Sequence, residues 1–454
     1  MYHNSAAKGR SYLNQNPQNT TKKIIFYHDN HDDLRSNWIN PSHPRSIRIS
    51  FNIFAQMKDE NDIKMIAKTN FGLEELLSQE LQRLGAKNVE IHNRAVSFSG
   101  DKGFMYKANL CCRVALRILV PFKSFKVSDE KSLYAGIQGI NWEDYMDVAD
   151  TIAIDTVLSS DLFTHSQYIS QKAKDAIVDQ FRAKHGERPS VDLDKPTLRI
   201  NLHIVGDTCT VALDSSGESL HKRGYRDKTN LAPINEVLAA GLVLLTGWDK
   251  RTNFIDPMCG SGTILIEAAL MANNIPAGYF REDFGFQRWN KFLPYEEELW
   301  NTIFDSAVNK ITNHEQKILG GELSPNVAKK AKENIKFAKV DDIVSIKNVD
   351  MKDFEVPAGR GVVVINPPYG ERMDKDNMEE LYKMMGDTFK KNFSGYDCWI
   401  LSSNMEAFKH VGLRPSRKIQ LYNGSLECRF LKFDLYSGSK KASKNTLQSG
   451  TDEV

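Results

Sequence analysis

The sequence predicts an α/β fold in which a parallel C-terminal sheet follows smaller α+β domains. Three observations predict it. The chain has 454 residues, about three times the typical length of one domain, and 41% of them are hydrophobic. Segments with strand and helix character also alternate regularly after residue 236, as they do in parallel sheets. This length and composition exclude a single small module and a globally disordered chain.

The formal net charge is only +2, so affinity for a polyanion requires clustered cations. The sequence contains no apolar run of ~18 residues, and residues 1–20 lack a secretory signal pattern. We therefore expect no membrane association. The six cysteines have neither the spacing of a zinc site nor the density of a disulfide scaffold, which predicts a reducing cytoplasm and no bound metal.

Residues 1–60 are rich in Asn and His and follow no helical or alternating period. They are predicted to be disordered, or to precede the true start of translation at Met57. His28 and His31 have no partner at a recognisable metal-site spacing.

Residues 61–110 form a predicted β–α–β segment. A strand from Ile63 precedes an amphipathic helix that Asn70 is placed to cap and Gly85 to end. Residues 111–215 continue with helices and with the strands TIAIDTVLSS, LRINLHIVG and TCTVALDSSG, which predict a small α+β domain with an antiparallel sheet.

Positive charge gathers on the helix 167–186 of this domain. Ile169, Ala173, Ile177 and Phe181 form its predicted buried stripe. The candidate RNA-binding cations on the outer face are Lys172, Lys174, Arg182 and Lys184. A merely solvated helix face is the alternative.

A second basic cluster, HKRGYRDK, lies in the predicted linker 216–235. Cations that neutralise phosphates beside a ring that stacks on a base are minimal equipment for binding RNA. The candidates here are Lys222, Arg223, Tyr225 and Arg226. A solvated linker is the alternative.

Residues 236–436 alternate strands with helices. The strands include NFIDPM, KILGGEL, IVSIKNVD and GVVVI, the last with the continuous apolar pattern of a fully buried strand. One helix has Ser324 at its N-cap and Pro325 at its first position. Asn423-Gly424 predicts a hairpin turn, so the last two strands are expected to be antiparallel. Residues 437–454 form a polar tail.

The turn DPMCGSGT, at 256–263, follows the first of these strands. Gly260 and Gly262 let the backbone turn sharply, and the helix N-terminus behind them offers N–H groups to an anion. A nicotinamide fingerprint and a P-loop are both incomplete, because Leu265 replaces the third glycine and no Gly-Lys-Ser/Thr follows. Glu322 ends the second strand, where it can bind a ribose diol. Asp350 and Asp353 follow the third strand, where one carboxylate can accept from an adenine amine; a solvated position is the alternative for either.

The most informative stretch is Asn366-Pro367-Pro368-Tyr369, directly after the buried strand. An amide and a carbonyl held rigid by prolines can accept both hydrogens of a planar exocyclic amine, and the tyrosine ring can stack on its base. Such contacts localise the nitrogen lone pair and favour alkylation of the amine.

With these motifs, residues 236–436 resemble a class I S-adenosyl-L-methionine-dependent methyltransferase, a Rossmann-like sheet with an antiparallel last strand. Residues 61–215 resemble the ferredoxin-like segment and THUMP RNA-binding domain of RlmL-type large-subunit rRNA guanine-N2 methyltransferases. DSSGESLHKRGYR and APINEVLAA match the junction in that family. The resemblance implies S-adenosyl-L-methionine as cofactor and RNA, 23S rRNA or a pre-50S particle, as partner. A second methyltransferase, fused in some relatives, does not follow, so one modification is expected.

The resemblance also implies roles for residues. The methionine part of the cofactor would contact the turn, Glu322 its ribose, and Asp350 with Met351 its adenine. The implied turn residues are Asp256, Pro257, Cys259, Gly260, Ser261, Gly262 and Thr263. The implied guanine-binding residues are Asn366, Pro367, Pro368 and Tyr369. Methylation of tRNA guanine, methylation of DNA adenine and a non-catalytic RNA-binding assembly role stay open as alternatives.

Overall fold

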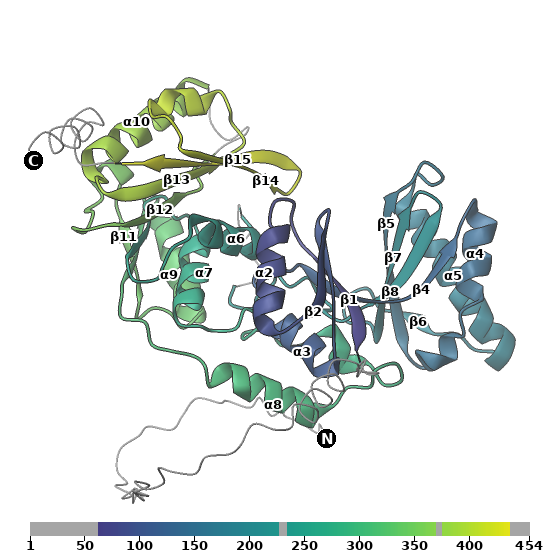
Figure 1. Ribbon diagram of the computed structural model, residues 1–454. Helices are drawn as coiled ribbons and strands as arrows, with labels where there is room; N and C mark the ends of the chain where they lie inside the picture. The colour runs from purple at the N-terminus through teal and green to yellow at the C-terminus, as the bar shows by residue number, and fades with distance from the viewer. Residues whose placement is uncertain (1–61, 227–233, 369–374, 436–454) are drawn as a thin grey trace, which may run out of the picture. The chain divides into compact units, whose positions relative to one another are not determined.

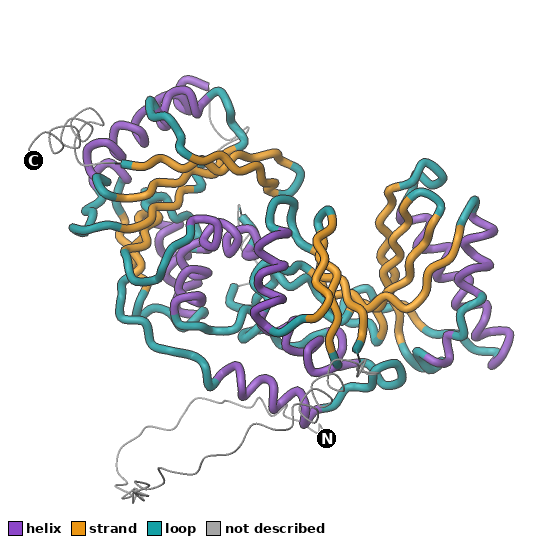
Figure 2. Tube along the Cα trace, viewed as in Figure 1, coloured by secondary structure: helices purple, strands orange, loops and turns teal. Residues whose placement is uncertain are grey.

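The computed structural model describes residues 62–226, 234–368 and 375–435, which form two sheets with their helices (Figures 1 and 2). The predictions for residues 1–60 and for the tail 437–454 concern residues outside these ranges.

The first sheet has eight strands in the order β2-β3-β1-β4-β8-β7-β5-β6. Its strands are β1 (Ile63–Lys68), β2 (Lys87–His92), β3 (Ala95–Gly100), β4 (Arg117–Lys126), β5 (Thr151–Ser159), β6 (Ser190–Val191), β7 (Leu198–Val205) and β8 (Thr208–Asp214). The long strand β4 pairs with β1 at one end and with β8 along most of its length. One sheet therefore runs through both segments that the sequence analysis separated at residue 110.

The prediction of an antiparallel sheet for residues 111–215 is wrong at β5, which pairs in parallel with both β7 and β6. The reason is the helix α5 (Ser166–His185), which carries the chain back before β6 and β7 begin. Such a long crossover is the connection that parallel strands require.

Helices α4 (Glu130–Gln138) and α5 pack together against one face of β4, β5 and β7 (Figure 1). Helices α2 (Glu74–Leu84) and α3 (Lys102–Cys111) pack against the strands of the preceding segment. The predicted stripes are buried, as Leu77, Leu81, Ile169 and Phe181 show. Gly85 ends α2 in the left-handed conformation, but Asn70 does not cap it: the N-cap is Leu73, whose backbone N–H donates to the Asn70 carbonyl.

The second sheet has seven strands in the order β11-β10-β9-β12-β13-β15-β14. Its strands are β9 (Asn253–Asp256), β10 (Ile318–Glu322), β11 (Val344–Asn348), β12 (Gly361–Ile365), β13 (Tyr396–Ser402), β14 (Arg417–Asn423) and β15 (Leu426–Asp434). β9 to β13 are parallel, and the β14–β15 hairpin is antiparallel, turning at Gly424 with φ of 63°. This confirms the predicted fold class and the hairpin.

Two cores cover the two faces of this sheet. Alternate residues of β12 belong to different cores, Val362 and Val364 to one and Val363 and Ile365 to the other. Helices α6 (Glu236–Thr246), α7 (Thr263–Ala272) and α9 (Pro325–Phe337) contribute to the first core, and α10 (Lys375–Asn392) to the second. The strand predicted to be buried is therefore buried on both sides. Helix α8 (Glu297–Val308), which packs on α3, was not predicted.

Candidate functional site

A cavity of about 590 Å³ lies at the carboxyl ends of the parallel strands. β10, β9 and β12 are neighbours, so the segments that follow them meet at one edge of the sheet. The lining residues are Pro257, Met258, Gly260, Glu322, Leu323, Val327, Val349, Asp350, Met351, Asn366, Pro367, Pro368, Leu381, Met384, Asn423 and Leu426. This volume is in the range of small-molecule sites.

The turn 257–262 is held to the neighbouring strand by its own backbone. The Cys259 N–H donates to the Gly321 carbonyl at 2.8 Å, and the Gly260 N–H donates to Oε2 of Glu322 at 3.0 Å. Gly260 and Gly262 have φ of 54° and 82°, the left-handed region that glycine adopts without strain. The predicted role of these glycines in forming a tight turn therefore agrees with the geometry.

Glu322 is fixed by two backbone donors. Its Oε1 accepts from the Ser324 N–H at 2.8 Å, while Oε2 accepts from Gly260. Both contacts orient the carboxylate at the cavity wall, where an oxygen can accept from a ligand hydroxyl. Ser324 is the N-cap of α9, as predicted, although its side chain makes no capping hydrogen bond.

Asp350 and Met351 also line the cavity, next to Val349. Oδ1 of Asp350 accepts from the Lys352 N–H at 3.1 Å, which orients this carboxylate, and Met351 is buried. A carboxylate beside apolar side chains suits the amine edge and the faces of a purine.

Asp256 and Cys259 stand behind this wall. Asp256 is buried and accepts from the Met258 N–H at 3.1 Å. Burial, together with the nearby Glu322 charge, raises its pKa to about 8, so the neutral acid prevails at pH 7. Burial also raises the pKa of the Cys259 thiol well above its ordinary value, which argues against Cys259 as a nucleophile. Neither residue lines the cavity, and neither do Ser261, Gly262 and Thr263.

Asn366, Pro367 and Pro368 also line the cavity, after the strand β12 that pairs with β9. The Oδ1 atom of Asn366 is buried and has no hydrogen-bond partner among the described residues. A buried acceptor of this kind is costly unless a ligand N–H satisfies it. The fourth predicted residue, Tyr369, lies outside the described residues.

Most apolar residues of the cavity wall were not predicted from the sequence as site residues. Leu323 is 68% exposed and Leu426 is 47% exposed, although both are large and apolar. Leu426 and Asn423 flank the turn of the β14–β15 hairpin, far along the chain from the other lining residues. Of these residues, only Leu323 could have been predicted from the sequence, because it is an apolar residue directly after Glu322 at a strand end.

The four cations predicted on α5 are accessible, and three of them contact acidic groups. Lys174 pairs with Asp175 at 2.7 Å, Arg182 with Asp179 at 3.4 Å, and Lys184 with Glu143 at 2.6 Å. The ammonium of Lys172 lies 5.4 Å from the centre of the Tyr168 ring. Exposed pairs of this kind contribute little to stability, about 0–1 kcal/mol.

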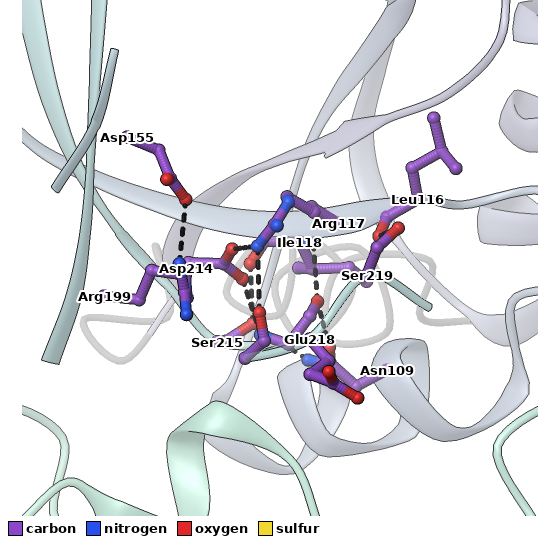
Figure 3. Close-up of polar contacts among 12 residues, drawn as sticks. Asn109, Leu116, Arg117, Ile118, Asp155, Arg199, Asp214, Ser215, Glu218 and Ser219 are labelled. Atoms are coloured by element: carbon purple, nitrogen blue, oxygen red, sulfur yellow. Dashed lines mark hydrogen bonds and ion pairs between the residues drawn. The ribbon is translucent and has the colours of Figure 1, made fainter. Parts of the chain in front are cut away.

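The predicted linker 216–235 is packed where the structure describes it. Ser215 and Ser216 are completely buried, and Asn109 of α3 donates to Oγ of Ser215 at 2.9 Å. Figure 3 shows this junction, in which Arg117 contacts Asp214 and, nearby, Arg199 pairs with Asp155 at 3.2 Å. The solvated-linker alternative is therefore wrong for the start of this segment, at Ser216.

Two of the predicted RNA-binding residues of this segment are buried. Arg223 is 2% exposed and Tyr225 is 1% exposed, and both contact Glu267 of α7. The prediction that Tyr225 stacks on a base and that Arg223 contacts phosphate is wrong, because their side chains belong to the interior. Arg226 is mostly buried against Glu236, while Lys222 is exposed beside Glu218 at 2.7 Å.

Within residues 62–226, 234–368 and 375–435, no helix is long and apolar enough to span a bilayer. Within those same ranges, no group of three or more His, Cys, Asp or Glu side chains is placed to hold a metal ion. Cys111, Cys112, Cys209, Cys259 and Cys398 form no disulfide bond.

Comparisons with known proteins agree with this architecture. Residues 64–119 match the RlmL ferredoxin-like domain, residues 127–214 the THUMP domain, and residues 223–432 the RMKL-like methyltransferase domain. The chain is 38% identical over 385 residues to a ribosomal RNA large subunit methyltransferase K/L from Syntrophotalea carbinolica. That match covers 82% of this chain and 54% of the relative, so the chain spans about half of that protein's length.

A putative RNA methyltransferase from Synechocystis is 35% identical over 367 residues, which cover 80% of this chain and 95% of the relative. The crystal structure of a putative methyltransferase, SMU.472, complexed with S-adenosylhomocysteine, aligns with a TM-score of 0.74 and 28% identity. It covers 84% of this chain and 100% of that structure. The cavity fits the same cofactor, since a carboxylate fixed by two N–H donors and an apolar wall suit its ribose and adenine. The chain therefore belongs to the family of THUMP-containing, S-adenosylmethionine-dependent methyltransferases with an RMKL-like catalytic domain.

Proposed function

We propose that this protein methylates the exocyclic N2 of a guanosine in RNA, with large-subunit rRNA, free or in a ribosomal precursor, as its substrate. The observation that carries the proposal is the buried Oδ1 of Asn366 at the cavity wall, next to two prolines, for which the described residues offer no hydrogen-bond donor. The THUMP domain and the name of the K/L relative support RNA of the large subunit as the partner.

The chemistry requires little beyond positioning. When bound, S-adenosylmethionine supplies an electrophilic methyl group on sulfur. Asn366 Oδ1 and the Pro367 carbonyl accept the N–H groups of the target amine, which points its lone pair along the line of transfer. Nitrogen forms the new bond to the methyl carbon as the carbon–sulfur bond breaks, S-adenosylhomocysteine leaves, and the extra proton on nitrogen passes to solvent.

The protein side of this step is pre-organised. Glu322 and the Gly260 N–H hold each other at 3.0 Å, so the turn presents a fixed wall to the cofactor. Proline rings fix the backbone after Asn366, which reduces the entropy lost when the base is held. The base must leave any stacked helix to reach such a pocket.

The test is to incubate purified protein with methyl-labelled S-adenosylmethionine and, separately, unmodified 23S rRNA, unmodified large-subunit precursor particles, tRNA and duplex DNA, and to identify labelled nucleosides by mass spectrometry. N2-methylguanosine from 23S rRNA or a precursor particle supports the proposal. Label in tRNA guanine or in DNA adenine contradicts the substrate, and labelled rRNA without N2-methylguanosine contradicts the target atom. Asn366→Ala serves as the control for label that does not arise in this cavity.

A further inference from the structure

Helix α7 begins at the cofactor turn, and three arginines from outside the catalytic sheet form hydrogen bonds or ion pairs with it. They are Arg113, which precedes β4, and Arg223 and Arg226 in the junction segment. All ten residues of α7 are buried, so these contacts are made in the interior. We call the three side chains the arginine clamp.

Arg113 holds the C-terminal end of α7. Its Nη2 donates to the Leu270 carbonyl at 3.3 Å and to the Ile275 carbonyl at 2.7 Å. The backbone of Arg113 is fixed in turn by Glu80 of α2, whose Oε2 accepts from its N–H at 3.0 Å. Through Glu80 and Arg113, the ferredoxin-like segment therefore reaches the catalytic helix directly.

Arg223 holds the middle of α7. Its Nε lies 3.5 Å from Oε1 of Glu267, and the Tyr225 hydroxyl donates to the same oxygen at 3.0 Å. The exposed fraction of the Arg223 side chain is 1% and that of Glu267 is 0%. Removing one partner of a fully buried ion pair destabilises the protein, because the other charge is left in the interior without compensation.

Arg226 holds the N-terminal end of α7. Its Nη1 lies 3.2 Å from Oε1 of Glu236, the first residue of α6, and its Nη2 donates to Oγ1 of Thr263, the first residue of α7. Arg226 thereby joins the two helices with one planar guanidinium, which has a donor for each.

Thr263 connects Arg226 to the cofactor turn. Oγ1 of Thr263 lies 3.3 Å from Oγ of Ser261, and the Ser261 carbonyl accepts from Nδ2 of Asn334 at 3.0 Å. The next residue back is Gly260, whose N–H holds Glu322. The path from Arg226 to the cavity wall thus runs through two side chains and one turn. Arg226 itself is not among the residues that line the cavity.

We propose that Arg226 is a positioning residue for the methyl-donor site. By holding Thr263, the first residue of α7, beside Glu236, it fixes the position of the N-terminal end of α7 and therefore the conformation of the turn that binds the cofactor. Through the arginine clamp, the ferredoxin-like segment and the junction segment contact the helix that follows that turn. The proposal goes beyond the proposed function, because it concerns cofactor binding and holds for any methyl acceptor.

The experiment measures the dissociation constant of S-adenosylhomocysteine for the full chain by calorimetry, in Arg226→Lys, Thr263→Val and the double variant. Lysine keeps the charge beside Glu236 but lacks the planar fork that reaches both partners. Arg226→Lys is expected to weaken binding about tenfold, the scale of one charge-assisted hydrogen bond. Thr263→Ser, which keeps the hydroxyl, is expected to bind within about twofold of the wild type.

The double variant separates positioning from additive damage. If Arg226 acts through Thr263, the double variant binds no more weakly than Thr263→Val alone. Additive losses, or wild-type affinity in Arg226→Lys, overturn the proposal. So does a lowered melting temperature with unchanged affinity of the folded protein, since that is a purely structural effect.

Two controls complete the design. Arg83→Ala removes an exposed arginine of α2 that contacts its own helix, and it is expected to leave the affinity unchanged. Methylthioadenosine, which lacks the amino-acid part of the cofactor, serves as a second probe. Weaker binding of both ligands in Arg226→Lys agrees with a displaced turn, whereas a loss confined to S-adenosylhomocysteine shows direct contact with the amino-acid part and overturns the assignment.

Discussion

The hydroxyl of Tyr225 donates to Oε1 of Glu267 at 3.0 Å, in the interior between the junction segment and α7. Tyr225 was predicted from the sequence to stack on a base, but this contact makes it part of the protein interior. Tyr225 satisfies a buried carboxylate that also pairs with Arg223. Its ring is inaccessible to a nucleic acid.

Tyr225→Phe tests this placement. Removing the hydroxyl leaves Glu267 with one donor fewer, so the free energy of unfolding is expected to fall by about 1–3 kcal/mol. RNA affinity is expected to stay unchanged, because the ring is buried. Chemical denaturation and a filter-binding titration measure the two quantities. Tyr168→Phe, which removes an exposed hydroxyl bonded to Glu130, is the control and should cost less than about 0.5 kcal/mol. Weaker RNA binding by a stable Tyr225→Phe protein would contradict the buried position.

Asn366→Ala is expected to lower the rate of methyl transfer about 100-fold or more while S-adenosylhomocysteine binds within about threefold of wild type. The reason is that Oδ1 of Asn366 is a buried acceptor at the cavity wall that no described residue pairs, whereas the cofactor turn keeps its own contacts. Single-turnover kinetics and calorimetry separate the two effects. Equal losses in rate and in cofactor affinity would mean that Asn366 supports the cofactor instead of the target amine.

Asp256→Asn is expected to change how stability depends on pH. The pKa of Asp256 is raised to about 8 by burial and by Glu322, from an unfolded value of ~3.9. The folded protein keeps the Asp256 proton over a pH range in which the unfolded chain releases it. The contribution of Asp256 to the free energy of unfolding is therefore complete below about pH 4 and is lost as pH rises through 8, at up to about 1.4 kcal/mol per pH unit.

Melting temperatures of wild type and Asp256→Asn between pH 4 and 9 measure this effect. Asn keeps an acceptor for the Met258 N–H but does not titrate, so the difference between the two proteins should change across this window. A constant difference would show that Asp256 is ionised in the folded protein throughout.

The cations of α5 are expected to contribute to RNA binding through phosphate contacts. Replacing Lys172 and Arg182 with Ala should weaken binding and reduce the slope of log affinity against log salt by about 0.7–0.9 per lost phosphate contact. Titrations at several salt concentrations measure the slope. Lys409→Ala, which removes an exposed cation paired with Glu406 in the catalytic half, is the control. An unchanged slope in the α5 variant would leave these side chains as a solvated helix face.

The local features of the site were readable from the sequence. Gly260 and Gly262 predicted the tight turn after β9, and Glu322 was predicted at the end of the next strand, where the structure has it. Asn366 and Pro367 followed a strand whose continuous apolar run predicted burial on both faces. These inferences succeeded because backbone conformation, strand period and the edge where parallel strands end depend on nearby residues or on a general rule of topology.

Tertiary structure alone decided which charges are buried and which distant residues share a wall. A basic segment looks the same in sequence whether it faces solvent or a buried acid, so Glu267, more than forty residues along the chain, determined the fate of Arg223 and Tyr225. The parallel pairing of β5 depended on where α5 returned the chain, and Leu426 reached the cavity only through the hairpin pairing of β14 with β15. The sequence by itself determined the chemistry that this protein carries, because motifs are local. The fold decided which charged groups are buried and which residues they pair with, because burial and charge pairing arise from contacts between residues that are remote in the chain.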